Sequence, residues 1–397
     1  MFCPVCVREY RQGVVTCSHC GNALVHELPH QNPDMAKPVR TLPVEFTGSA
    51  REYFRIWIVN LCLTLLTAGI FSAWAKVRKK RYYYSHTMLD GTPFQYLGRP
   101  IPILKGRVIA AIAFSAYYVS SHFFTAMLPY VFIAGAVLAP WVIIRSAAFN
   151  ARYSAFRNMT FRFDGKYLAA LKAIYALGII PALLVVIAMV FAWRGQYASI
   201  AMAAAFIIFG LSFPWWIKQV KSFIIGHTSY GSREGNLSAT GGQFFKVYLM
   251  AVLILLAIVV MSGIILAVTI SYFKNASPLL VVLAAVPMYA GYVLSYAYIK
   301  ARGTNLVWNH TQLGQVHFES TLTAGGMAKL YLTNALVIIA SLGLMTPWAV
   351  MRTLKYRIDN LRVLLEGDLT DFRGSETDTV QAAGAEFGDF FDMDLSL

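Results

Sequence analysis

The chain has 397 residues, of which 57% are hydrophobic and only 13% are charged. Soluble domains carry about 25% charged residues, so this composition excludes an ordinary soluble enzyme. The formal net charge of +15 does not indicate a nucleic-acid-binding protein, because the basic residues cluster beside the ends of long apolar runs.

Four of the five cysteines lie near the N-terminus as two C-x-x-C pairs, Cys3 with Cys6 and Cys17 with Cys20. Two such pairs provide four thiolates for one tetrahedral zinc ion, which can fold a segment too short to have a core. We therefore predict a structural zinc ribbon over residues 1–27, with zinc as its cofactor. Two disulfides or a redox pair are the alternatives, and the cytoplasmic location inferred below disfavours disulfides.

Two polar segments flank the apolar part of the chain. Residues 28–43 contain four prolines among polar residues and are expected to form a linker. Residues 366–397 carry nine acids and one base, which predicts a disordered acidic tail. The tail could bind a cytoplasmic protein partner.

Residues 44–365 contain the apolar runs and are expected to form a membrane domain. Runs such as Leu177–Trp193 and Val252–Ile270 have the length that crosses a hydrocarbon core of about 30 Å. No signal peptide is visible before the first run, which begins near Tyr53. Lys76–Arg81 follow this run, and basic residues in such positions mark the cytoplasmic side. We predict a multi-pass protein of the bacterial inner membrane with both termini cytoplasmic.

A pattern recurs five times along this domain. Each unit opens with a short strand-like segment and a glycine, continues through an apolar stretch and ends at an aromatic residue. The aromatic residues are Trp74, Trp141, Trp215, Tyr298 and Trp348. Arginine follows four residues later in four units, as Arg78, Arg145, Arg302 and Arg352, and histidine follows twelve residues later in three, as His86, His227 and His310. The fold class expected is therefore all-α and polytopic, with pseudo-repeated helical hairpins and short cytoplasmic strand-like segments.

The first and last units match most closely. Asn60, Gly69, Trp74 and Arg78 recur at identical spacing as Asn334, Gly343, Trp348 and Arg352. Both units are too short for two crossings of the membrane. A single crossing would place the two ends of a unit on opposite sides, although the flanking elements are equivalent in all units and are expected on the same side. We expect each to enter the membrane, bend at Gly69 or Gly343 and return, which gives six full spans and two re-entrant segments. Eight full spans are the alternative.

These motifs resemble the YjgN-like family of uncharacterised bacterial inner-membrane proteins. The likeness rests on Glu52–Trp57, Leu65–Ile70 and Ala73–Arg78, and continues through Arg81-Tyr82 to Asp90-Gly91. It covers roughly residues 44–363 and leaves the zinc ribbon as an addition. The resemblance implies a location in the inner membrane but no activity.

The candidate site residues are polar groups at the ends or inside apolar segments. Asn60 and Asn334 could form an intramembrane polar site or simply hydrogen-bond helices together. The four arginines and three histidines of the repeat could contact an anion or a lipid headgroup. Alternatively, the arginines only set topology, and each histidine hydrogen-bonds its own turn. Asp90-Gly91 and Asp164-Gly165 fit hairpin turns.

The sequence contains no recognisable catalytic constellation, so we do not expect an enzyme. One reading is a channel, transporter or lipid-handling protein for an anionic solute or headgroup. The alternative is a membrane scaffold that recruits cytoplasmic partners through its zinc ribbon and acidic tail. A polar cavity would favour the transport or lipid-handling hypothesis, and a closed helical bundle without a cavity would favour the scaffold hypothesis. The bilayer is the expected partner, nucleic acid is not, and the oligomeric state is undetermined by sequence.

Overall fold

The computed structural model describes residues 39–176, 178, 198–272 and 278–366, together with a β-bridge between Thr16 and Ala23. The chain divides into two compact units, Met1–Arg40 and Thr41–Leu397. The four cysteines predicted to bind zinc and the residues after Glu366 lie outside the described part. Residues 39–42, expected to be the end of a linker, instead form strand β1 (Val39–Leu42).

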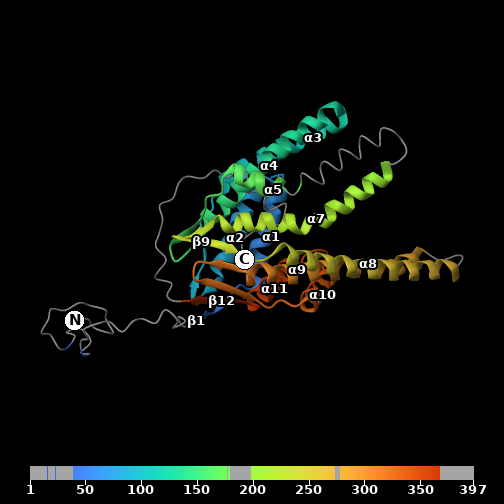
Figure 1. Cartoon of the computed structure of the whole chain (residues 1–397). Helices are drawn as coiled ribbons and strands as arrows, with labels where there is room; N and C mark the ends of the chain where they lie inside the picture. Colours follow the sequence, from blue (N-terminus) through green and yellow to red (C-terminus); the bar gives the residue numbers. More distant parts are fainter. Residues whose placement is uncertain are drawn as a thin grey trace. The chain divides into compact units, whose positions relative to one another are not determined.

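Most of the described residues are helical (Figure 1). The helices are α1 (Ala50–Leu66), α2 (Ser72–Ser85), α3 (Pro100–Phe123), the 3-10 turn η1 (Thr125–Met127), α4 (Leu128–Tyr153), α5 (Tyr167–Tyr175), α7 (Ala198–Gly226), α8 (Gly241–Tyr272), α9 (Pro278–Asn309), α10 (Ala324–Ala340) and α11 (Thr346–Asp359).

Three described helical stretches are long and apolar enough to cross a membrane. They cover Pro100–Phe123, Thr125–Tyr153 and Gly241–Tyr272, and between 6% and 11% of their apolar windows is buried. Large apolar side chains on them, such as Phe114, Val137 and Val260, are exposed to their surroundings. Apolar surface on this scale requires lipid or a protein partner as its neighbour. The polytopic membrane class is thus supported, while the number of six full spans stays a prediction.

The strand-like segments form far more sheet than the sequence predicts. The described strands are β1, β2 (Val44–Phe46), β3 (Thr87–Leu89), β4 (Thr92–Pro93), β5 (Gln95–Tyr96), β6 (Ser154–Phe156), β7 (Met159–Phe163), β8 (Thr228–Tyr230), β9 (Arg233–Leu237), β10 (Thr311–Leu313), β11 (Val316–Ser320) and β12 (Leu361–Glu366). Nine of them join in one sheet in the order β1-β12-β11-β10-β9-β8-β7-β6-β5, and the other three form the sheet β2-β3-β4. The mostly helical class with short strand-like segments is confirmed, but the assignment to the all-α class is wrong, because these segments hydrogen-bond to one another in a large antiparallel sheet.

The two sheets together make a closed ring of strands. The chain runs from β1 to β2 through Pro43 and from β4 to β5 through Phe94, so each end of one sheet continues into an end of the other. Side chains from strands all round the ring pack into one cluster, including Leu42, Phe156, Tyr230 and Val363. The long helices project to one side of these strands (Figure 1).

Four tight hairpins connect neighbouring strands, each with a two-residue turn. Positive φ angles in these turns occur at Asp90 and Gly91, at Arg157 and Asn158, at Gly231 and at Gly314. Positive φ angles occur in type I′ and type II′ turns, whose backbone twist matches the right-handed twist of the two paired strands. The turn predicted at Asp90-Gly91 is confirmed. The one predicted at Asp164-Gly165 is wrong, because Asp164 follows β7 and donates its backbone N–H to the carbonyl oxygen of His227 at 3.1 Å.

That backbone bond is one of five equivalent bonds, one in each unit. The residue before the opening glycine, or its counterpart, donates its N–H to the carbonyl oxygen of the last residue of the unit's last helix or of the residue directly after it. The pairs are Thr47 to His86, Leu97 to Tyr153, Asp164 to His227, Ser238 to His310 and Thr321 to Asn360, at 2.9 to 3.1 Å. Each unit therefore begins and ends at the same place beside the ring, which confirms the predicted five-unit repeat.

The first and last units are helical hairpins with the same internal structure. The turn after α1 places Gly69 at φ 93°, and the turn after α10 places Gly343 at φ 90°. Both hairpins therefore bend at the predicted glycines. Helix α1 packs against α11, which brings the two ends of the membrane domain together.

Candidate functional site

A cavity of about 770 Å³ lies between the ring of strands and the helices above it. One part of its wall consists of residues that point into the ring, among them Thr87, Leu89, Tyr230, Val316 and Val363. The other part comes mainly from α2, α10 and α11. This volume lies in the range of small-molecule binding sites, and the wall is mostly apolar, as such sites usually are.

The first and last units present the same helical face to the cavity. From α2 these are Lys76, Lys79, Lys80 and Tyr83, and from α11 they are Val350, Thr353, Leu354 and Arg357. The two sets occupy equivalent positions of the repeat and have the 3- and 4-residue spacing of one face of a helix. The pseudo-symmetry of the outer units therefore frames the cavity from two sides.

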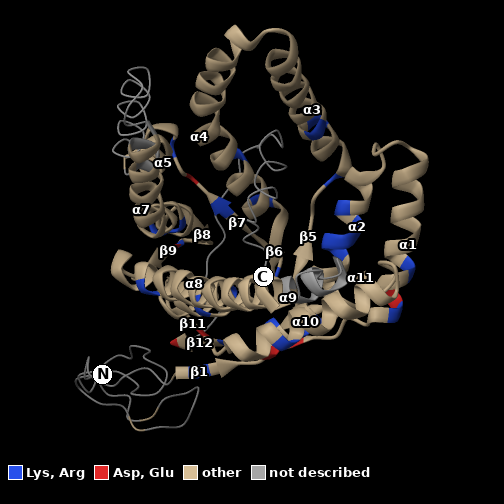
Figure 2. Cartoon of the chain, turned by 90° about the vertical axis from the view of Figure 1, so that its right-hand side faces the viewer, with Lys and Arg blue, Asp and Glu red and all other residues tan. Residues whose placement is uncertain are grey.

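The charges in the cavity wall are all positive. Lys76, Lys79, Lys80 and Arg357 line it, and no Asp or Glu is among the described lining residues. Lys221 and Lys300 lie within electrostatic reach of Arg357. Figure 2 shows the concentration of basic residues on α2. A partly enclosed site with one sign of charge attracts ions of the other sign.

Lys80 is the most buried of these cations, with 6% of its surface exposed. Its ammonium group lies 3.3 Å from Oδ1 of Asn150 on α4 and 5.6 Å from the centre of the Tyr96 ring. Lys80 therefore brings a buried amino group to the cavity wall, close to the exposed cations Lys79 and Arg357.

The strand side of the cavity is neutral. Tyr230 donates its hydroxyl to the carbonyl oxygen of Phe156 at 2.8 Å. Burial raises the pKa of Tyr230 to about 12, and the charge of Arg157 opposes this shift only partly. The hydroxyl therefore stays protonated at any physiological pH and does not repel an anion.

Each predicted asparagine is paired with the arginine of its own unit. Oδ1 of Asn60 lies 3.5 Å from Nη1 of Arg78, and Oδ1 of Asn334 lies 3.2 Å from Nη1 of Arg352. Asn334 also donates to the carbonyl oxygen of Ala349 and to Oγ1 of Thr353. Both asparagines are buried, but only Asn334 is among the residues that line the cavity. The polar site shared by the two asparagines stays a prediction.

The predicted arginines pack mainly against aromatic rings. The guanidinium of Arg145 lies over Trp141, that of Arg352 over Trp348 and that of Arg78 over Phe71, at 5.2 to 5.8 Å from the ring centres. Arg302 is exposed on α9. None of these four lines the central cavity. The aromatic-then-arginine motif is therefore in part a stacked pair on the helix surface.

The three repeated histidines sit at helix ends, also outside the cavity wall. Nδ1 of His86, His227 and His310 lies 2.8 to 2.9 Å from the carbonyl oxygen four residues earlier in the same helix. This is the contact with its own turn that was the alternative to ligand binding. The threonine after each histidine bonds the next carbonyl of that helix in the same way.

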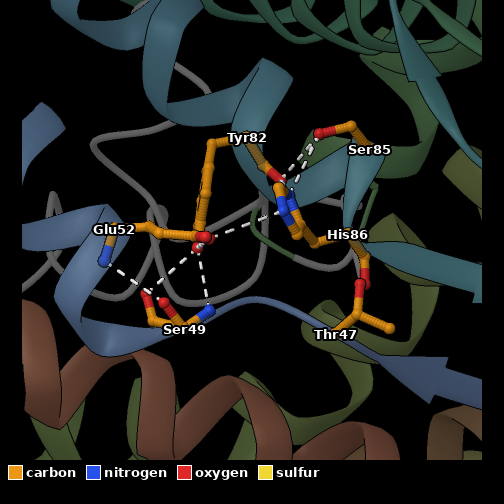
Figure 3. Close-up of polar contacts among 6 residues, drawn as sticks. All are labelled: Thr47, Ser49, Glu52, Tyr82, Ser85 and His86. Atoms are coloured by element: carbon orange, nitrogen blue, oxygen red, sulfur yellow. Dashed lines mark hydrogen bonds and ion pairs between the residues drawn. The ribbon is translucent and has the colours of Figure 1, made fainter.

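His86 also joins a polar network that links the two ends of the first unit (Figure 3). Tyr82 donates its hydroxyl to the carbonyl oxygen of Ser49 at 3.0 Å and accepts from the N–H of Ser49 at 2.8 Å. The carboxylate of Glu52 lies 3.2 Å from the Tyr82 hydroxyl and 3.9 Å from Nε2 of His86. Equivalent residues at the last unit, Thr323 and Tyr356, are 3.2 Å apart. The network therefore links the two ends of the first hairpin.

Sequence reasoning missed Lys76, Lys79, Lys80 and Arg357 as site residues. The basic run on α2 was interpreted as a marker of the cytoplasmic side, and Arg357 lies outside the aromatic-then-arginine pattern. The signal that could have found them is helical spacing, since positions 76, 79, 80 and 83 match 350, 353, 354 and 357 of the last unit.

Comparison with known proteins identifies relatives but no solved fold. The model of the family described as "Bacterial protein of unknown function (DUF898)" matches residues 41–390. The inner membrane protein YjgN of Salmonella typhimurium is 24% identical over 355 residues, covering 82% of this chain and 88% of the relative. YjgN of Escherichia coli K12 is 25% identical over 362 residues, with 82% and 89% covered. No solved structure matches the chain significantly.

Proposed function

The chain belongs to the DUF898 family of bacterial proteins, and from this premise we propose that it is a multi-pass inner-membrane protein that takes up an anionic amphiphile in its central cavity. The YjgN relatives are inner-membrane proteins by name, and the apolar helices agree with that location. The observation that carries the proposal is a mostly apolar cavity whose charged groups are all basic.

The wall chemistry favours a ligand with a negative head and an apolar chain. Lys76, Lys79 and Arg357 supply donors and positive charge for a phosphate or carboxylate group. The apolar residues of the ring and of α10 provide a surface for a hydrocarbon chain. A small hydrophilic anion would leave that surface in contact with water. The activity proposed is binding and passage of a lipid-like anion, without catalysis.

Direct binding tests the proposal. Full-length protein in a neutral detergent is titrated with dodecyl phosphate by calorimetry. We expect saturable binding, weakened roughly tenfold by Arg357→Gln, because a hydrogen bond to a charged group contributes about 1.5 to 3 kcal/mol. Lys355→Gln is the matched control, since Lys355 is exposed on the same helix and does not line the cavity.

Binding of dodecyl phosphate by the wild type and the two variants can support or contradict the proposal. If the wild-type protein does not bind dodecyl phosphate, or if Lys355→Gln weakens binding as much as Arg357→Gln does, the cavity is not the site. Equal binding of neutral dodecanol and dodecyl phosphate would also contradict the proposal, since the basic groups would then be without effect.

The scaffold alternative and the zinc ribbon rest on segments outside the described residues. Zinc bound by Cys3, Cys6, Cys17 and Cys20 stays part of the proposal on the spacing of the cysteines alone. Elemental analysis of purified protein should give one zinc per chain. Absence of zinc, with the four cysteines paired as disulfides, would remove the ribbon.

A further inference from the structure

A second cavity, whose wall shares Phe94 with that of the central one, lies between α1, α2 and β5. Its volume is about 650 Å³, and its wall contains three arginines, Arg55, Arg78 and Arg81. No Asp or Glu is among the described residues that line it. We call it the arginine groove. Its wall shares none of the basic residues of the central cavity.

The three guanidinium groups are only partly used by the protein. Arg81 donates through Nη2 to the carbonyl oxygen of Gly98 at 3.3 Å, and Arg78 contacts Asn60 at 3.5 Å. Arg55 makes no hydrogen bond or ion pair with another residue that the structure describes. Because each guanidinium carries five N–H donors, most donors in the groove remain available.

One carboxylate lies beside the groove and is held by other groups. Glu52 is one turn before Arg55 on α1, and its carboxylate is 3.2 Å from the hydroxyl of Tyr82, which lines the groove, and 3.9 Å from Nε2 of His86 (Figure 3). Three arginines from α1 and α2 thus line one open volume, and no acidic residue is among the described residues of its wall. Arginine holds phosphate oxygens through paired N–H groups, so this arrangement suits a phosphate group.

The surroundings of the groove suit the headgroup level of a bilayer. Trp74 precedes Arg78 by one turn of α2, and tryptophan followed by arginine is typical of the interface between hydrocarbon and headgroups. Towards the bend of the hairpin, α1 exposes Val59, Leu65 and Leu66, of which 47%, 72% and 81% of the surface is accessible. An apolar surface therefore continues from the groove in the direction of the hydrocarbon.

We propose that the arginine groove binds the phosphodiester headgroup of an anionic phospholipid, whose acyl chain lies along the exposed apolar face of α1. The lipid fills the gap between the first hairpin and strand β5 of the second unit. Its role is to hold these two units together at the membrane surface, and it is distinct from the ligand of the central cavity.

Native mass spectrometry of the full chain tests this inference. Detergent-solubilised protein is titrated with dioleoyl phosphatidylglycerol or dioleoyl phosphatidylcholine. We expect a tight phosphatidylglycerol adduct whose affinity falls roughly tenfold in Arg55→Gln, because charged hydrogen bonds are lost. Arg55→Lys should retain part of the affinity, since it keeps the charge but not the paired donors.

Two controls separate this site from others. Arg51→Gln removes the same charge from the exposed first turn of α1, outside the groove, and should leave the adduct unchanged. Arg357→Gln affects the central cavity and should also leave it unchanged. Equal phosphatidylglycerol binding by wild type and Arg55→Gln, or an equal loss in Arg51→Gln, would overturn the proposal.

The source of the phosphate is tested in the same experiment. Millimolar inorganic phosphate should not displace phosphatidylglycerol, because the acyl chain contributes to its binding. Displacement would show that the groove binds free phosphate and would overturn the lipid assignment. Equal binding of phosphatidylcholine would show that the arginines do not select a negative headgroup, with the same consequence.

Discussion

At the scale of single residues, the two outer units hold their hairpins together with an asparagine–arginine pair at the same position. The two pairs are not equally well satisfied. The side chain of Asn334 makes three hydrogen bonds at 3.0 to 3.2 Å, whereas the contact between the side chains of Asn60 and Arg78 is long, at 3.5 Å. A buried polar group that loses its partners is costly, so the difference has a measurable consequence.

We expect Asn334→Ala to destabilise the protein by about 1 to 3 kcal/mol, because it leaves the guanidinium of Arg352 and the hydroxyl of Thr353 with fewer partners. Asn60→Ala should reduce the stability of the protein clearly less than Asn334→Ala does. Thermal unfolding of the two variants in the same detergent measures the order. A larger loss of thermal stability in Asn60→Ala than in Asn334→Ala would contradict the hydrogen bonds described for the two outer units.

At the scale of elements, each outer hairpin depends on a glycine in a left-handed conformation. Gly69 and Gly343 adopt φ angles that other residues rarely adopt, although a side chain at either would meet no neighbouring atom within 4 Å. The bend is therefore set by backbone conformation and not by packing. This is why the sequence predicted it, since glycine in an apolar segment is a local signal.

Gly343→Ala should destabilise the last hairpin by about 1 kcal/mol, because the methyl group disfavours a positive φ. Gly263→Ala is the matched control. Gly263 lies within helix α8 and also has no neighbouring atom within 4 Å of its added methyl group, so that change should be neutral or slightly stabilising. The unfolding temperatures of both variants in detergent show whether each substitution lowers or raises the stability of the protein. A drop for both, or for neither, would contradict the role given to the bend.

The sheet could not be predicted in the same way. Its strands are two to six residues long, too short to show a reliable alternation of apolar and polar residues. Strands β7 and β9, for example, pair with β8 and β10, which follow the last helix of the same unit. Such pairings arise only when the helices between the two strands have folded back. The central cavity was missed for the same reason, because Lys79 and Arg357 come together only through the pairing of the first and last units.

At the scale of the whole molecule, the five closing bonds place both ends of every unit on the same side of the helices. Helix α1 has 17 residues, a length of roughly 25 Å, which is shorter than a hydrocarbon core of about 30 Å. Helix α2 carries Lys76, Arg78, Lys79, Lys80 and Arg81 and does not fit a full crossing. The first unit is therefore expected to enter the membrane and return.

Topology reporters test this arrangement. Fusions truncated after Gly48 and after Arg81 should both report the cytoplasmic side in cells, because the hairpin between them does not cross. A cytoplasmic signal after Gly48 with a periplasmic signal after Arg81 would establish a full first crossing and end the re-entrant model. A fusion after Phe123, at the end of the apolar helix α3, serves as the positive control for the opposite side.

Photo-crosslinking tests most directly whether an anionic amphiphile occupies the cavity beside α10 and α11. The probe is an alkyl phosphate with a diazirine in its chain, applied to the full-length protein in membranes. Crosslinked peptides should map to α10 and α11, and Arg357→Gln but not Lys355→Gln should reduce their yield. Crosslinks confined to the lipid-facing helices α3 and α8, and unaffected by Arg357→Gln, would contradict the account.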